Sequence, residues 1–145
     1  MPTFVKSVLI DAPARDVFGF HERDDAFALL SPSFPPAREI SRTGGIQTGA
    51  QVILQVGPFR WIARHTAYEQ DRLFVDEQVR GPFRSWVHRH EFEAVDGKTK
   101  LTDRIEYQLP GGTVVNLLLG WLVNAGLANM FRHRHRVTRE FCEQP

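Results

Sequence analysis

Cysteine is almost missing from this sequence of 145 residues. Cys142 is the only one, which excludes a disulfide within the chain and favours a reducing compartment. The N-terminus also lacks the basic-then-apolar pattern that is typical of a secretory signal peptide. We therefore expect a cytoplasmic protein.

The chain also lacks a large net charge of either sign. The formal net charge is +1, so the charge balance gives no reason to expect nucleic acid or an anionic membrane as a partner. The sequence also contains no glycine-rich phosphate loop, no nucleophile elbow, no paired zinc-ligand spacing and no kinase or Rossmann signature. We expect no cofactor.

Hydrophobic residues make up 42% of the chain and charged residues 24%, which is typical of one globular domain of this length. The β-branched and apolar residues of 3–10 predict a strand, and Pro13 then suits the first turn of a helix. Two short helices should follow before the prolines of 32–36. Beyond them, period-two alternation and regular turn residues predict an antiparallel meander with strands at 38–43, 50–56, 60–69, 73–80, 84–95 and 99–109.

The last segment, 113–142, is rich in leucine, valine and aromatic residues and predicts one long helix. Residues 113–131 carry no formal charge, so a membrane span has to be weighed. Three asparagines and two glycines within the stretch favour a soluble helix that packs on a sheet. The basic residues of 132–139 are expected to form a solvated helix end, with an RNA or phospholipid contact as the alternative.

Three stretches carry a family resemblance: 12–18, then 74–92 through Trp86, His88, His90 and Phe92, and 101–110. With them the chain resembles the START-like, or SRPBCC, superfamily, and within it the bacterial branch related to polyketide cyclase/dehydratase-like proteins. The resemblance implies a single α+β domain over 1–145 with a helix-grip fold. Such a fold has a seven-stranded antiparallel sheet curved around a long C-terminal helix, two short helices after the first strand, and a mostly apolar cavity. The superfamily includes lipid carriers, hormone sensors, aromatic cyclases and oxygenase subunits, so the fold does not choose among functions.

Strand alternation predicts which side chains face that cavity, because residues two apart share a face of the sheet. The inward residues of 60–69 are expected to be Trp61, Ala63, His65 and Ala67. Those of 84–95 are expected to be Trp86, His88, His90 and Phe92, and those of 99–109 are Leu101, Asp103, Ile105, Tyr107 and Leu109. Small alanines beneath bulky neighbours leave room for a ligand.

A polar cluster follows from this assignment. His88, His90 and Asp103 should lie on one interior face, and Asp76 and Gln78 of the preceding strand are candidates to join them. A buried carboxylate is costly unless it is paired, so an imidazole beside Asp103 is chemically sensible. Three interpretations stay open: a structural network, recognition of the polar end of an apolar ligand, or acid–base catalysis by a His–Asp pair. A metal site is disfavoured, although His65 would be available to join the other histidines, because no cysteine or acidic cluster completes a familiar ligand set.

The tetrapeptide Gly-Pro-Phe-Arg occurs twice, at 57–60 and 81–84, at turns that should share one rim of the meander. Phe59 and Phe83 are therefore predicted to lie side by side, with Phe34 as a third residue at the cavity mouth. Two similar turns without a further role are the alternative.

Together these observations predict a protein that binds a small hydrophobic molecule, lipid-like, aromatic or polyketide-like, without nucleic acid and without stable membrane insertion. A cyclase or dehydratase that uses His88 or His90 with Asp103 is the enzymatic alternative. A pure interaction module is the third possibility, because the long helix has more apolar positions than one sheet face can cover. For the same reason a homodimer through the start of that helix is expected.

Overall fold

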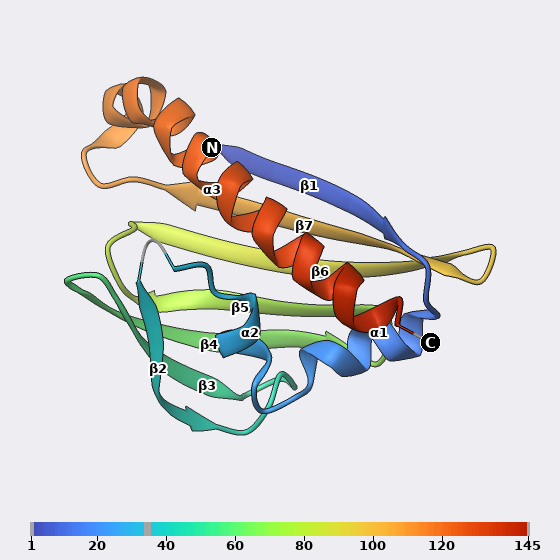
Figure 1. Cartoon of the computed structure of the whole chain (residues 1–145). Helices are drawn as coiled ribbons and strands as arrows, with labels where there is room; N and C mark the ends of the chain where they lie inside the picture. The colour runs from blue at the N-terminus through green and yellow to red at the C-terminus, as the bar shows by residue number, and fades with distance from the viewer. Residues whose placement is uncertain (1, 34–35, 145) are drawn as a thin grey trace.

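Two layers form the molecule: one antiparallel sheet and the helices on its concave face (Figure 1). The computed structural model describes residues 2–33 and 36–144. The strands are β1 (Thr3–Ile10), β2 (Ala37–Thr43), β3 (Gln51–Val56), β4 (Phe59–Glu69), β5 (Leu73–Arg80), β6 (Ser85–Val95) and β7 (Lys98–Gln108). The helices are α1 (Ala14–His21), α2 (Ala26–Leu30) and α3 (Gly112–Cys142).

The predicted helix-grip architecture is confirmed. The sheet order is β1-β7-β6-β5-β4-β3-β2, so the meander runs in sequence order and β1 pairs with β7 at the other end. All six pairings are antiparallel, as hairpin connections require. Each strand end lies within one residue of its expected position, and α3 begins one residue earlier than predicted.

Two clusters of buried side chains fix the helices to the sheet. The first joins α1 to the sheet through Phe18, whose ring contacts Phe74 and Phe92 edge-on. The second joins α3 to β1 and β7 through Phe131, Leu127 and the fully buried Tyr107, among others. Between these clusters, beneath α2 and α3, the sheet borders a cavity.

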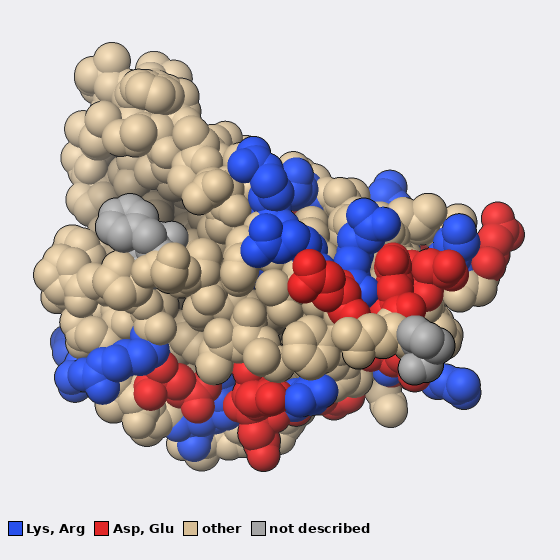
Figure 2. Space-filling view, in the orientation of Figure 1, with Lys and Arg blue, Asp and Glu red and all other residues tan. Residues whose placement is uncertain are grey.

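The first turns of α3 project beyond the rest of the molecule as an uncharged lobe (Figures 1 and 2). Leu117, Leu118 and Trp121 are 76%, 64% and 70% exposed. By length and composition α3 is apolar enough to cross a membrane, but its second half contributes Leu127, Phe131 and other side chains to the domain interior. Helix α3 thus packs into the domain through its second half, whereas the sheet leaves its apolar first half uncovered.

One inward assignment is wrong. The pairing of β4 with β5 shifts its register between His65 and Ala67, which marks a bulge. A bulge inserts an extra residue and moves the following side chains to the opposite face. Tyr68 therefore turns to the interior, where its ring lies 5.6 Å from that of Phe18, in the position that simple alternation gives to Ala67.

Candidate functional site

A cavity of about 410 Å³ lies between the sheet, α2 and α3. Seven of the predicted ligand-binding residues line it: Trp61, Ala63, His65, Asp76, Trp86, His88 and His90. Helix α3 covers them with Val123, Leu127, Met130 and Phe131. Strand β3 and helix α2 add aliphatic and aromatic side chains, and the polar residues His65, Asp76, His88 and His90 lie together on β4, β5 and β6.

Four predicted site residues do not line this cavity, for identifiable reasons. Phe92 belongs to the cluster around Phe18, and Asp103 lies behind the histidines of β6. The hydroxyl of Tyr107 lies 2.6 Å from Asn124 Oδ1 and 3.0 Å from the Gly120 carbonyl oxygen, so this residue fastens α3 to β7. The amide of Gln78 donates to the Phe83 carbonyl and accepts from the Phe83 N–H, which braces the β5–β6 turn.

The predicted aromatic mouth is present only in part. Phe83 lines the cavity, and its ring centroid lies 5.7 Å from that of Trp61 and 4.8 Å from that of Trp86. Phe59 is 51% exposed and is not part of the cavity lining, so the two phenylalanines do not form the expected pair at the cavity mouth. Phe34 lies outside the described residues.

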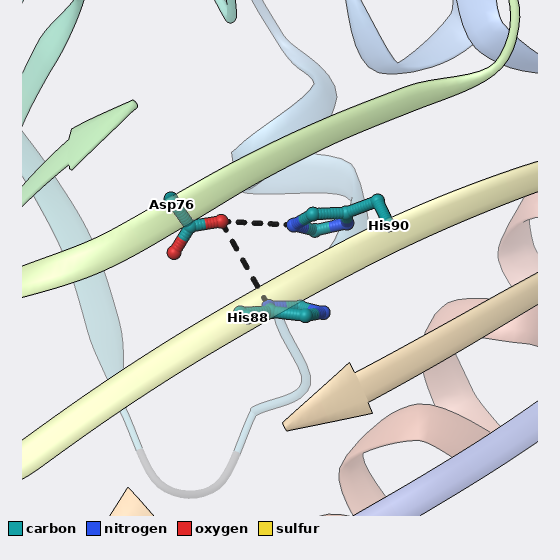
Figure 3. Close-up of side chains that lie close together, drawn as sticks. All are labelled: Asp76, His88 and His90. Atoms are coloured by element: carbon teal, nitrogen blue, oxygen red, sulfur yellow. Dashed lines mark hydrogen bonds and ion pairs between the residues drawn. The ribbon is translucent and has the colours of Figure 1, made fainter. Parts of the chain in front are cut away.

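Asp76, His88 and His90 converge from two neighbouring strands (Figure 3). Asp76 is the cross-strand partner of His88, and the two histidines share a face because they are two residues apart on β6. His90 Nε2 donates to Asp76 Oδ2 at 2.8 Å, and His88 Nδ1 lies 3.9 Å from the same oxygen. The potential ligand atoms of the three side chains all lie within 4.8 Å of one another. This is the part of the cluster that faces the cavity.

Asp103 contacts the ring nitrogens of His88 and His90 that point away from Asp76. Its Oδ1 accepts from His88 Nε2 at 2.7 Å and lies 3.3 Å from His90 Nδ1. Its Oδ2 accepts from His135 Nε2 of α3 at 2.7 Å. Three imidazoles therefore satisfy one buried carboxylate, which offsets the cost of removing that charge from water. Sequence reasoning missed His135, because alternation identifies partners within a sheet and does not reveal which turn of a helix lies above them.

Protonation in this cluster follows from the contacts. Burial alone would lower the pKa of His90, but hydrogen bonds to Asp103 and Asp76 outweigh it and raise that pKa. Burial, aided by the neighbouring His90, lowers the pKa of His88. Although burial opposes ionisation, the hydrogen bond from His90 and the nearby imidazoles lower the pKa of Asp76 to about 2. The His90 ring is stacked between Phe74 and His88 at centroid distances of 3.8 and 3.7 Å, and its two nitrogens lie between the two carboxylates.

Several polar residues of the cavity wall were not predicted, among them His21 of α1 and Arg134 of α3. His21 is buried beside Phe74, Phe92 and His90, and its Nδ1 donates to the Val17 carbonyl at 2.8 Å. Arg134 belongs to the basic run expected to be solvated, but its guanidinium lies 5.1 Å from the Phe131 ring centroid, and burial lowers its pKa. Helical periodicity places Arg134 on a different face of α3 from its exposed neighbours, and this periodicity is the feature of the sequence that could have predicted its burial.

The remaining arginines of the run follow the expectation. Arg132, Arg136 and Arg139 are exposed, and basic side chains gather over the second half of α3 (Figure 2). Together with Lys6 they border a surface groove that also contains Glu140 and Glu143. The acidic residues make this face mixed in charge.

The comparisons with known proteins agree with this geometry. Residues 10–135 match the family described as "Polyketide cyclase / dehydrase and lipid transport". A nucleoside-diphosphate sugar epimerase from Corynebacterium glutamicum is 26% identical with a TM-score of 0.77, and the match covers 94% of this chain and 28% of that protein. This chain therefore spans less than a third of that epimerase.

Two further solved structures show the same fold over nearly their whole length. A START superfamily protein from Mycobacterium smegmatis is 16% identical with a TM-score of 0.68, covering 98% of this chain and 97% of that one. A protein from Thermus thermophilus is 15% identical with a TM-score of 0.72, covering 96% and 95%. No curated protein sequence gives a significant match. From the family match and the fold, the chain belongs to the polyketide cyclase/dehydrase and lipid transport family of the START-like superfamily.

Proposed function

We propose that this protein binds a small hydrophobic molecule, lipid-like, aromatic or polyketide-like, in the cavity between the sheet and α3. The observation that carries this proposal is the cavity wall, to which Trp61, Phe83 and Trp86 contribute three mutually packed rings and Ala63 a small side chain. Its volume of about 410 Å³ falls within the range of roughly 300–1,000 Å³ that small-molecule sites occupy. The family description, which includes lipid transport, supports the same class of ligand.

The ligand we infer carries a polar group at one end. His65 Nδ1 and Arg134 Nε are buried and have no hydrogen-bond partner among the described residues, and both side chains line the cavity. An unpaired polar atom in an interior costs roughly 1–3 kcal/mol, so a ligand that pairs with it gains that much. Arg134 Nε can only donate, which favours a carbonyl, hydroxyl or carboxylate oxygen on the ligand.

The test uses the dye 1-anilinonaphthalene-8-sulfonate, which joins an apolar ring system to an anionic group. Trp61 and Trp86 line the cavity, whereas Trp121 is exposed on α3. A Trp121→Phe background therefore restricts tryptophan emission to the cavity, and we expect bound dye to quench it. Native mass spectrometry of gently purified protein, followed by extraction, then identifies any natural ligand.

A pair of matched variants distinguishes dye binding in the cavity from dye binding at other apolar surfaces. Ala63→Phe places a ring inside the cavity, whereas Ala94→Phe adds the same ring on an exposed position of β6. We expect Ala63→Phe to weaken dye binding by at least about tenfold, or roughly 1.4 kcal/mol, and Ala94→Phe to leave it unchanged. Equal binding by wild type and Ala63→Phe would place the dye on the exposed lobe of α3 and contradict the proposal.

A second candidate, an acid–base enzyme of the cyclase or dehydratase type, is favoured by one observation. His88 lines the cavity while its other edge donates to Asp103, so a carboxylate orients an imidazole toward a bound substrate. The variant His88→Leu separates the two functions. For a binding protein it weakens ligand binding, whereas for an enzyme ligand binding survives and turnover is lost.

We further propose that the exposed start of α3 is an interface between two copies of the chain. Large apolar side chains of α3, among them Leu117 and Trp121, are too exposed to contribute to the fold of one copy. We place the protein in the cytoplasm, in agreement with its soluble START-like fold and its single thiol.

A further inference from the structure

We propose that Asp76, His88 and His90 form a binding site for one divalent transition-metal ion in the wall of the cavity. Their potential ligand atoms, one carboxylate oxygen and two imidazole nitrogens, lie within 4.8 Å of one another. All three side chains line the cavity, so the site is open toward a bound molecule. Two imidazoles and one carboxylate suit ions such as Zn²⁺, Co²⁺ or Fe²⁺.

The spacing of the ligand atoms fits a metal ion. With bonds of about 2.0–2.2 Å, two ligand atoms at tetrahedral or octahedral angles are roughly 3.0–3.5 Å apart. Asp76 Oδ2 lies 2.8 Å from His90 Nε2 and 3.9 Å from His88 Nδ1, on either side of that range. Binding one ion therefore requires these side chains to move, because the two imidazoles are also stacked, with ring centroids 3.7 Å apart. The ion takes the place of the proton that His90 Nε2 shares with Asp76.

The outer contacts match those of a metal centre. Metal-binding histidines usually donate their second N–H to a carboxylate, which fixes the ring orientation and leaves the other nitrogen for the ion. Asp103 has this role here, because its Oδ1 accepts from His88 Nε2 at 2.7 Å and lies 3.3 Å from His90 Nδ1. His135 fixes Asp103 in turn through a bond of 2.7 Å. The nitrogens left over, His88 Nδ1 and His90 Nε2, are those that face Asp76 (Figure 3).

A second observation comes from β4. His65 lines the same cavity, is 5% exposed, and its Nδ1 has no hydrogen-bond partner among the described residues. It is the cross-strand partner of Asp76, so an unpaired imidazole nitrogen lies beside the cluster. Sequence analysis placed Asp76 among the candidates of this polar cluster but disfavoured a metal site, because only the strand register shows that its carboxylate lies opposite His88.

The test is a titration of the chelator-treated protein with Zn²⁺ against a competing colorimetric chelator. We expect one equivalent to bind with a Kd of about 10 µM or tighter. Asp76→Asn and His90→Gln should each weaken binding by at least about tenfold, comparable to the loss of an outer contact at known sites. His133→Gln, in the basic run outside the cluster, should bind as the wild type does. Equal affinity of Asp76→Asn, His90→Gln and wild type, or no one-equivalent binding, would overturn the proposal.

A measurement on the wild-type protein remains decisive if these variants fail to fold. With Co²⁺ bound, two exchangeable imidazole N–H protons should show paramagnetically shifted NMR signals, those of His88 Nε2 and His90 Nδ1. Their absence at saturating Co²⁺ would refute the site. Because the titration contains no dye or other organic molecule, its failure leaves the proposed hydrophobic ligand binding intact, and the reverse also holds.

Discussion

His21 should make the stability of the fold depend on pH between about 4 and 6.5. The ring is 9% exposed and is surrounded by Phe74, Phe92 and His90. Burial lowers its pKa from 6.5 to about 4, with His90 and Arg134 acting in the same direction and the Val17 carbonyl and Asp103 against it. The perturbation that tests this is His21→Leu, which removes the titrating group and keeps an apolar side chain.

The sign of the effect follows from proton uptake. Above pH 6.5 His21 is neutral in the folded and the unfolded chain and makes no pH-dependent contribution. As the pH falls below 6.5 the unfolded chain binds a proton that the folded chain does not, so the free energy of unfolding decreases. The interval from 6.5 to about 4, at about 1.4 kcal/mol per pH unit, corresponds to about 3.5 kcal/mol in full and to about 3 kcal/mol at pH 4, where the folded group is half protonated. Below about pH 4 both states are protonated and the loss is complete.

Urea denaturation of wild type and His21→Leu from pH 4 to pH 8 measures this contribution. The difference between the two proteins at pH 8 gives the cost of the altered packing, since the imidazole is neutral in both states there. We expect the stability advantage of wild type over His21→Leu to shrink by about 3 kcal/mol between pH 7.5 and pH 4. Parallel pH curves for the two proteins would refute the reasoning.

Two further predictions concern α3. Gly111 has φ +105°, and an added Cβ would lie 2.6 Å from Val115 Cγ2, so Gly111→Ala should lower the free energy of unfolding by more than about 1 kcal/mol in chemical denaturation. Gly97→Ala, at φ +78° with nothing within 4 Å, is the matched control, and an equal loss would exclude the contact with Val115. For the proposed homodimer, light scattering at micromolar concentration should give twice the chain mass for wild type and the monomer mass for Leu117→Glu; a monomeric wild type contradicts it.

The local pattern of the sequence was sufficient for the elements and for the side chains that β4 and β6 contribute to the cavity wall. Period-two alternation on β6 put Trp86, His88 and His90 on the inner face, because successive side chains of a strand must point to opposite faces. Turn residues fixed the meander, and α3 was evident from its long apolar run. The same rule failed at the bulge after His65, since an inserted residue reverses the alternation without a clear mark in the sequence.

Only the tertiary structure decided which inward residues share the cavity and which groups meet across it. Asp103 and Tyr107 point inward as alternation requires, but α3 crosses β7 and buries them beneath His135 and Asn124. Asp76 meets His88 and His90 because of the strand register. Arg134 lines the cavity, unlike its exposed neighbours, because it lies on the face of α3 that packs toward the sheet. Strand and helix periodicity are encoded within a few residues, whereas these contacts join residues 12 to 32 positions apart along the chain. They depend on register and on how α3 lies across the sheet, which no local pattern specifies.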